Sequence, residues 1–312
     1  MNKFAFFFPG QGSQSVGMLA GFATESNIGK VIHDTFIEAS DIVGVDFWAM
    51  ATESNESINE TTNTQPIMLI TGIATWRAWQ ATSNHVPSIL AGHSLGEYTA
   101  LVASGAISFA DALPLVRYRA EVMQAAVPVG VGAMAAILGL DDDIVRAVCL
   151  EAAQDEVCEA VNFNSPGQVV IAGNKAAVER GMELAKSKGA KRALALPVSV
   201  PSHCALMKPA AVKLAEYLKN VMVSAPTIPV LHNADVAAYN DADKIKDALV
   251  RQLYSPVRWV ESVQAVQIAG ITQAAECGPG KVLAGLTKRI VNDLPCTALT
   301  TDEALQAFNS AL

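Results

Sequence analysis

What this sequence of 312 residues lacks excludes several classes of protein. It has five cysteines, an odd number, and no C-x-x-C pair, so neither a disulfide framework nor a zinc site is indicated. The formal net charge of -8 disfavours nucleic acid and anionic membranes as general partners. No apolar run is long enough to span a membrane, although the mean hydropathy is +0.29. We therefore expect a protein of the reducing cytoplasm, with no metal.

The sequence also lacks repeats, low-complexity tracts and a secretory leader. The apolar run at 4–8 is too short for a leader, because Pro9 and Gly10 end it, and it predicts a buried strand instead. Hydrophobic residues make up 51% of the chain, enough to fill a substantial core. The length predicts one large domain or two modest ones.

Residues 91–98 read AGHSLGEY and contain the G-x-S-x-G pattern of a nucleophile elbow. The apolar run at 88–91 predicts a parallel strand before this motif, and a helical pattern follows it. At such a turn Ser94 occupies strained backbone, and the residues two positions away must be small. Gly92 and Gly96 meet that requirement, so a nucleophilic serine is favoured over a helix N-cap serine.

A glycine-rich loop at 9–18, PGQGSQSVGM, follows the first predicted strand. It fails as a dinucleotide fingerprint, because G-x-G-x-x-G would need glycine at position 15, which is Ser15. In enzymes that use this elbow, a loop after an earlier strand supplies a second N–H to the oxyanion hole. The loop around Gln11 is the expected supplier.

A helical pattern opens at Ser108 and carries an apolar stripe. Arg119 lies on that stripe and Arg117 on the polar side, so we expect Arg119 to point inward. An inward arginine is costly unless it meets an anion, which is either a structural carboxylate or a substrate's. These two readings are equally balanced on the pattern alone. Pro114 removes one hydrogen bond of this helix and predicts a local kink.

Residues 128–199 follow a different pattern, in the order β-α-β-β-α-β of a ferredoxin-like unit. The expected elements are 132–138, 141–153, 158–163, 168–172, 175–188 and 191–198. We therefore predict an α/β protein: a hydrolase-like large domain of residues 1–127 and 200–312, with a parallel sheet, and an inserted small domain of residues 128–199. A ligand cleft is expected between the two.

The base that an elbow serine needs is sought among five histidines. We expect His203 at the end of the strand predicted at 191–198, after Ser94 in chain order, which is the order used with this elbow. His93 adjoins the nucleophile, and adjacent side chains rarely share a direction, so a structural role is favoured for it. No acidic residue between Ser94 and His203 qualifies as the third member of a triad, and this weakens the reading as an ordinary serine hydrolase such as a thioesterase.

Five segments together carry a resemblance over nearly the whole chain. They are FPGQGSQ (8–14), GHSLGE (92–97), NFNSPGQ (162–168), VPSH (200–203) and ECGPGK (276–281). In these segments the sequence resembles the bacterial malonyl-CoA:acyl carrier protein transacylases of fatty acid synthesis. The resemblance implies malonyl transfer from malonyl-CoA to the phosphopantetheine thiol of acyl carrier protein, through a malonyl-serine intermediate and without a metal or redox cofactor.

The same resemblance implies roles for individual residues. Ser94 is then the nucleophile, His203 the base, and Arg119 the ligand of the malonyl carboxylate. The backbone N–H groups of Gln11 and Leu95 form the oxyanion hole. Two supporting residues complete the implied site, Gln252 and Asn162. In the family, a main-chain carbonyl near the position of Gln252 orients the histidine.

An acidic carrier protein would need a local basic patch on this acidic chain. The candidates are Lys191, Arg192, Lys281, Lys288 and Arg289, for each of which a solvated charged face is an equally good reading. A carrier-protein-binding module without catalytic activity remains an alternative. We expect a monomer, because no apolar stripe marks a dimer interface.

Overall fold

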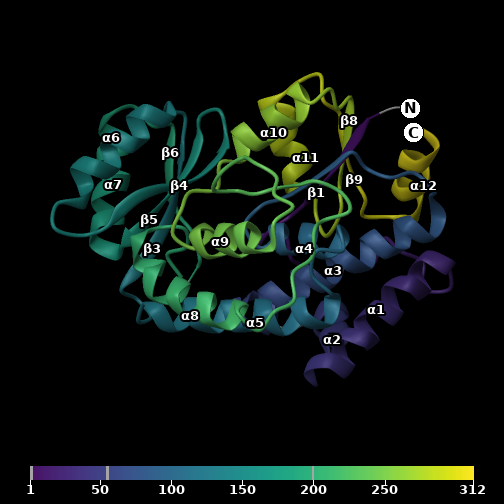
Figure 1. Cartoon of the computed structure of the whole chain (residues 1–312). Coiled ribbons are helices and arrows are strands. Elements are labelled where there is room, and N and C mark those ends of the chain that lie inside the picture. The colour runs from purple at the N-terminus through teal and green to yellow at the C-terminus, as the bar shows by residue number, and fades with distance from the viewer. Residues whose placement is uncertain (1–2, 54–55, 199) are drawn as a thin grey trace.

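The protein is described from a computed structural model, which covers residues 3–53, 56–198 and 200–312 (Figure 1). Two β-sheets organise these residues: a five-stranded sheet in the order β7-β2-β1-β8-β9 and a four-stranded sheet in the order β4-β5-β3-β6. In Figure 1 the four-stranded sheet, with its two helices, lies to one side of the five-stranded one. Every paired neighbour in the five-stranded sheet is parallel.

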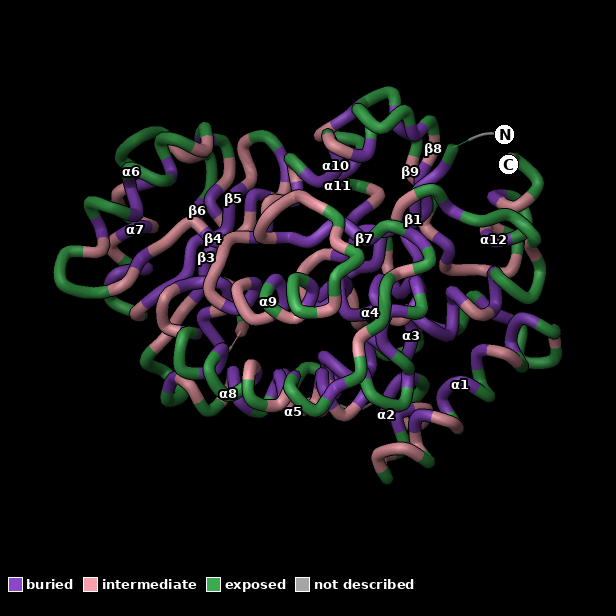
Figure 2. Tube along the Cα trace, in the orientation of Figure 1, coloured by how far each residue is buried: buried purple, intermediate pink, exposed green. Residues whose placement is uncertain are grey.

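The five-stranded sheet is built around β1, whose residues are all buried (Figure 2). Its strands are β1 (Phe4–Phe8), β2 (Ile89–Gly92), β7 (Val230–Leu231), β8 (Gln273–Glu276) and β9 (Cys296–Ala298). Successive side chains of a strand point to opposite faces, and an internal strand of a parallel sheet is covered on both. Phe4, Phe6 and Phe8 accordingly enter one hydrophobic cluster and Ala5 and Phe7 another.

Two groups of helices cover the two faces of this sheet. The first group packs in the cluster of Phe6 and consists of α1 (Asn27–Val43), α2 (Phe47–Thr52), α3 (Thr61–Thr82), α4 (Gly96–Ala103), α5 (Phe109–Ala126), α8 (Lys208–Leu218), α9 (Ala242–Gln252) and α12 (Asp302–Ser310). The second packs in the cluster of Phe7 and consists of α10 (Trp259–Ile268) and α11 (Val282–Ile290). A short 3₁₀ helix, η1 (Glu56–Asn59), precedes α3.

The four-stranded sheet is antiparallel and has the predicted β-α-β-β-α-β order. Its elements are β3 (Gly132–Leu138), α6 (Asp142–Ala153), β4 (Cys158–Ser165), β5 (Gln168–Asn174), α7 (Lys175–Ser187) and β6 (Arg192–Ala195). With the parallel sheet and its strand-turn-helix motif, this confirms the predicted fold class. The two domain boundaries stay a prediction.

Backbone hydrogen bonds tie the small sheet to the rest of the molecule. Phe163 of β4 donates its N–H to the carbonyl of Val257 over 3.0 Å, and Val257 donates to the carbonyl of Val161 over 2.8 Å. Val257 lies in the turn between α9 and α10, five residues after Gln252. The position of β4 is therefore coupled to the end of α9.

Several expected element boundaries are wrong. The strand predicted at 191–198 ends at Ala195. The Leu196 N–H still donates to the Met134 carbonyl, but Pro197 has no N–H with which to continue the pairing. The residue pattern after His203 also predicts a helix over 204–219. In the structure this helix, α8, begins only at Lys208, after the short 3₁₀ helix η2 (Ala205–Met207).

A further wrong boundary is the start of the helix that the pattern over 66–80 predicts, with Thr64 as its N-cap. This helix, α3, begins at Thr61, and the Thr64 hydroxyl donates back to the carbonyls of Ile58 and Glu60 instead of capping. Helix α5 continues through Pro114, which stands inside it.

The close approach of α4 to β1 makes a direct test of the fold. A Cβ atom added at Gly96 would lie 2.0 Å from the Phe8 carbonyl oxygen, and this backbone cannot move without disturbing the sheet. We expect Gly96→Ala to lower the free energy of unfolding by at least about 2 kcal/mol. Urea denaturation measures this change.

Gly285 provides the control, since it lies within α11 with nothing within 4 Å of an added Cβ. We expect Gly285→Ala to stabilise the protein by about 0.5–1 kcal/mol. A Gly96→Ala variant as stable as the wild type would contradict the packing described.

Candidate active site

The turn between β2 and α4 holds Ser94 in a strained backbone conformation. Its φ of 51° lies in the left-handed region, which non-glycine residues rarely occupy. The turn closes so tightly that a Cβ at Gly92 would lie 1.9 Å from the backbone of Gly96. The turn therefore requires glycine at position 92, two residues before the serine. Backbone strain of this kind is typical of functional sites.

Ser94 and His203 are in direct contact. Ser94 Oγ lies 2.8 Å from His203 Nε2, and His203 Nδ1 lies 2.8 Å from the main-chain carbonyl oxygen of Gln252. A carbonyl only accepts hydrogen bonds, so Nδ1 carries the proton and Nε2 is free to accept from the serine hydroxyl. This is the hydrogen-bond pattern of a nucleophile with its general base.

The sequence pattern predicted His203 at the end of a strand, and this prediction is wrong. The strand ends at Ala195, and the histidine is on the following loop, with a φ of 66°. Its N–H donates to the Leu253 carbonyl over 2.9 Å. Both the backbone and the ring of His203 are thus held by the end of α9.

Burial lowers the pKa of His203 to about 3, and the positive charge of Arg119 lowers it further in the same direction, while the hydrogen bond to Gln252 opposes the shift. The ring is only 2% exposed, so a charged imidazolium would lose nearly all of its solvation. At neutral pH the ring is therefore uncharged and able to accept a proton.

Gln11 and Leu95 lie close to the serine. Both residues line the cavity around Ser94. Across the described part of the chain, neither backbone N–H donates to an internal acceptor. Leu95 directly precedes α4, whose N-terminus favours negative charge. The pair could hold the oxyanion of a tetrahedral intermediate.

Arg119 is buried beside the serine, with 1% of its surface exposed. One Nη donates to the Gln65 side-chain oxygen over 2.6 Å, and the other donates to that of Gln252 over 2.9 Å and to Ser94 Oγ over 3.4 Å. These acceptors are neutral, and no carboxylate pairs with Arg119 in the residues described. Burial without a counter-ion lowers the pKa of Arg119. The cavity therefore presents a cation without a carboxylate partner.

The cavity over Ser94 is narrow, about 110 Å³, and both sheets contribute to it. Met134 of β3 and Asn162 of β4 line it opposite the elbow. Asn162 lies at an irregularity in the β4–β5 pairing, and its buried side-chain oxygen has no partner in the described residues. The predicted cleft residues of the two sheets thus meet around Ser94.

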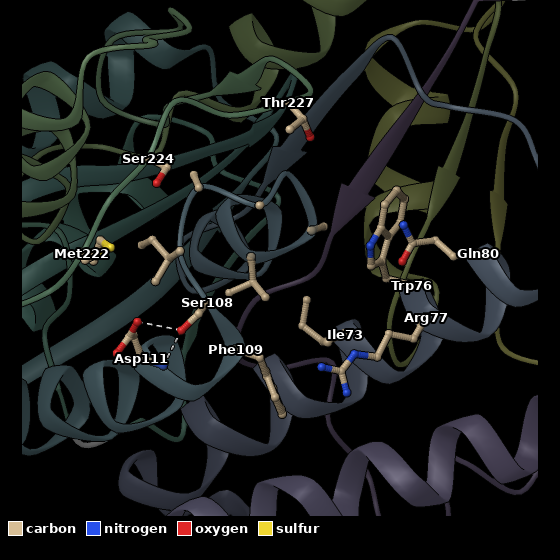
Figure 3. A pocket seen from close by; sticks show the side chains of 15 residues that line it. Ile73, Trp76, Arg77, Gln80, Ser108, Phe109, Asp111, Met222, Ser224 and Thr227 are labelled. Atoms are coloured by element: carbon tan, nitrogen blue, oxygen red, sulfur yellow. Dashed lines mark hydrogen bonds between the residues drawn. The ribbon is translucent and has the colours of Figure 1, made fainter.

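A larger cavity of about 460 Å³ lies elsewhere, between α3 and the start of α5 (Figure 3). Trp76 and Arg77 of α3 line one side, and Ser108 and Asp111 lie across from them, joined by a hydrogen bond. Its lining contains no histidine and no cysteine. Despite its size, this cavity has no serine–histidine pair like that of Ser94 and His203.

Sequence reasoning missed two residues that hold the elbow in place. Asn233 accepts from the Ser94 N–H over 2.7 Å and donates to the Gly92 carbonyl over 2.6 Å. Glu97 accepts from the Asn233 N–H over 2.9 Å. Glu97 stands in the elbow motif itself, and Asn233 follows β7, but neither pattern shows that they meet.

His93 has the structural environment expected for it. Its Nε2 lies 2.8 Å from the side-chain oxygen of Asn164, its ring lies against Trp259, and burial lowers its pKa. The five basic docking candidates are all exposed. Among the described residues, no cluster of three or more metal-ligating side chains is found, and none of the helices is long and apolar enough to cross a membrane.

A serine, a base and an unpaired cation at a strand-turn-helix are features of enzymes that handle acyl groups. Residues 5–289 match the model of the acyl transferase domain, and the chain belongs to this family. It is 55% identical over 308 residues to the malonyl CoA-acyl carrier protein transacylase of Salmonella typhimurium, covering 98% of this chain and 99% of that protein.

Solved structures give the same picture. The acyl-carrier-protein S-malonyltransferase of Burkholderia pseudomallei superimposes with a TM-score of 0.95 at 59% identity, covering 99% of both chains. A malonyl-transacylase determined in complex with a type II PKS acyl-carrier protein superimposes with a TM-score of 0.97 at 51% identity, over 100% of both chains.

The low pKa of His203 predicts a pH dependence of stability. The unfolded histidine binds a proton below about pH 6.5, whereas the folded one stays neutral down to about pH 3. The unfolded state therefore binds more protons in this window, and stability falls as the pH drops, by about 1.4 kcal/mol per unit from this group.

We expect His203→Gln to remove that contribution, so that its unfolding free energy falls less steeply between pH 6.5 and pH 4.5. Urea denaturation at several pH values measures both slopes. His85→Gln, at an exposed position, is the control and should keep the wild-type slope. Equal slopes for all three proteins would show that His203 titrates normally.

Proposed function

We propose that this chain is a malonyl-CoA:acyl carrier protein transacylase that supplies malonyl groups to fatty acid synthesis in the cytoplasm. The proposal needs no metal or redox cofactor. The observation that carries it is the contact of Ser94 Oγ with His203 Nε2 at 2.8 Å, with the Arg119 guanidinium 3.4 Å from the same oxygen. The names of the relatives and of the solved structures support it.

The reaction begins with attack of Ser94 Oγ on the thioester carbon of malonyl-CoA, while His203 Nε2 takes the hydroxyl proton. The N–H groups of Gln11 and Leu95 hold the oxyanion. Collapse of the intermediate breaks the carbon–sulfur bond, and His203 returns the proton to the departing CoA thiolate. The pantetheine thiol of the carrier protein then attacks the malonyl-Ser94 ester by the same steps.

Arg119 accounts for the choice of acyl group. A malonyl carboxylate can make a bidentate pair with its guanidinium, and apolar side chains such as Met123 and Met134 form part of the lining of the cavity around Ser94, which strengthens such a pair. An acetyl group leaves the cation unpaired. The narrow cavity of about 110 Å³ suits a short acyl group. Asn162, with its unpaired oxygen, supports this part of the site.

The domain division predicted above fits this mechanism. A large domain of residues 1–127 and 200–312 would contribute the nucleophile, the base and Arg119, and residues 128–199 would cover them. A cover of this kind keeps water from the malonyl-serine ester, as a transferase requires and a hydrolase does not.

The first experiment measures intact mass after brief mixing with malonyl-CoA, without carrier protein, on the wild type and on Ser94→Ala. A single malonyl adduct on the wild type alone is expected. Steady release of malonate without an adduct would indicate a thioesterase. No adduct and no turnover would indicate a binding module without catalytic activity.

Replacing Arg119 tests the basis of selectivity. We expect Arg119→Ala to slow acylation by malonyl-CoA by about a hundredfold or more while acetyl transfer is kept or gained, because only the malonyl group presents a carboxylate. Quenched-flow mass spectrometry with each thioester measures both rates. An unchanged preference for malonyl over acetyl would refute this role.

Docking of the carrier protein is expected on the exposed basic residues Lys191, Arg192, Lys281, Lys288 and Arg289. Since exposed charges are screened by salt, the transfer to carrier protein should weaken as ionic strength rises, while acylation by malonyl-CoA in its absence changes less. Steady-state kinetics at about 20 and about 300 mM salt, between which the screening length shortens severalfold, distinguish the two steps. A salt-independent carrier-protein step would rule out this patch.

A further inference from the structure

One fully buried carboxylate of the site has no part in the mechanism above. Glu97 lies three residues after Ser94, in the first turn of α4, and none of its surface is exposed. Three nitrogens surround its carboxylate: His232 Nδ1 at 2.7 Å, the Asn233 N–H at 2.9 Å and the Gln252 side-chain amide at 2.9 Å. Such a set satisfies an ionised carboxylate, which only accepts hydrogen bonds.

The contact with Gln252 links Glu97 to the reacting groups. The Gln252 amide nitrogen also donates to the Ser94 carbonyl over 3.0 Å, and its side-chain oxygen accepts from Arg119 over 2.9 Å. Its main-chain carbonyl accepts from His203. A single residue therefore contacts the nucleophile, the base and the cation.

Glu97 and the Ser94 carbonyl together fix which way the Gln252 amide faces, because both accept from its nitrogen. An amide can be turned by half a revolution, which exchanges its donor and acceptor ends. A carboxylate accepts only from the NH₂ end, so the oxygen end is directed to Arg119. In the opposite orientation the NH₂ group would face the guanidinium, donor against donor, and the amide oxygen would face the carboxylate.

The amide also keeps the carboxylate away from the cation. If Glu97 paired with Arg119 directly, the guanidinium would be occupied and neutralised before substrate arrived. With Gln252 between them, the negative charge is close enough to compensate a buried cation in part, while Arg119 itself donates to the neutral side-chain oxygen of Gln252. Arg119 stays available to an incoming carboxylate.

We propose that Glu97 is a positioning residue for selectivity: through the Gln252 side chain it orients Arg119 toward the malonyl carboxylate. This inference rests on the function proposed above. Glu97 also has a structural role, because it accepts from Asn233, which in turn accepts from the Ser94 N–H. The two roles can be distinguished by experiment. Loss of that second contact would slow malonyl and acetyl transfer alike, whereas loss of Arg119 orientation affects malonyl alone.

The first test compares acylation of Glu97→Gln by malonyl-CoA and by acetyl-CoA, using quenched-flow mass spectrometry. The ratio of the malonyl rate to the acetyl rate is expected to fall at least about tenfold, in the direction expected for Arg119→Ala. Glu276→Gln is the matched control. Glu276 is also fully buried but caps α11 through the Ala284 N–H, so this variant should keep the wild-type ratio.

A double-mutant cycle tests whether the effect passes through Gln252. Gln252→Ala keeps the main-chain carbonyl that His203 uses but removes the amide. If Glu97 acts through that amide, Glu97→Gln changes the selectivity ratio in the wild type and leaves it unchanged in the Gln252→Ala background. An equal change in both backgrounds would overturn the proposal.

The exchange Glu97→Gln/Gln252→Glu keeps a hydrogen-bonded pair in place and covers the case in which the single variant fails to fold. It brings a carboxylate directly onto Arg119, so the ratio should fall below that of the wild type by at least about tenfold. A wild-type ratio in this double variant, or a proportional loss of both rates in Glu97→Gln, would overturn the proposal. Absence of a malonyl adduct on the wild type would instead refute the proposed function.

Discussion

The site depends on a buried cation that has no carboxylate partner among the residues the structure describes. Arg119 is 1% exposed, donates to neutral oxygens of Gln65, Gln252 and Ser94, and lies over the Tyr98 ring. A bare charge at such depth is costly unless polar groups are fixed around it. The ends of α3, α4 and α9 meet at Arg119 and supply those groups. The same charge lowers the pKa of His203 and so helps to keep it neutral, and in the function proposed above it also selects the acyl group.

Local patterns predicted the elements of the fold well. The alternation of Phe4, Phe6 and Phe8 with Ala5 and Phe7, the glycines around Ser94 and the β-α-β-β-α-β order of the small sheet each depend on near neighbours in the chain. Errors occurred where a boundary depended on a partner strand or a proline. Pro197 stops the last strand of the small sheet, and His203 therefore lies on a loop instead of a strand end.

The polar network could not be predicted in the same way. Glu97 lies more than a hundred residues before Asn233 and Gln252 in the chain, and its hydrogen bonds to them depend on how α4, β7 and α9 come together. Helical periodicity did predict an inward Arg119, because this depends on one helix alone. Which anion it meets could not be decided from that helix, and the resemblance to a family supplied the expectation.

The two backbone hydrogen bonds between β4 and Val257 have a consequence for how this active site can change over time. They join β4, which carries Asn162 in the cavity lining, to the turn after α9 without using any side chain. Substitutions at Met134, Asn162 or the loop before His203 can therefore alter which acyl group is accepted while this connection is kept. A pocket framed in this way can acquire new substrates by single substitutions, because its frame does not depend on the residues that would vary.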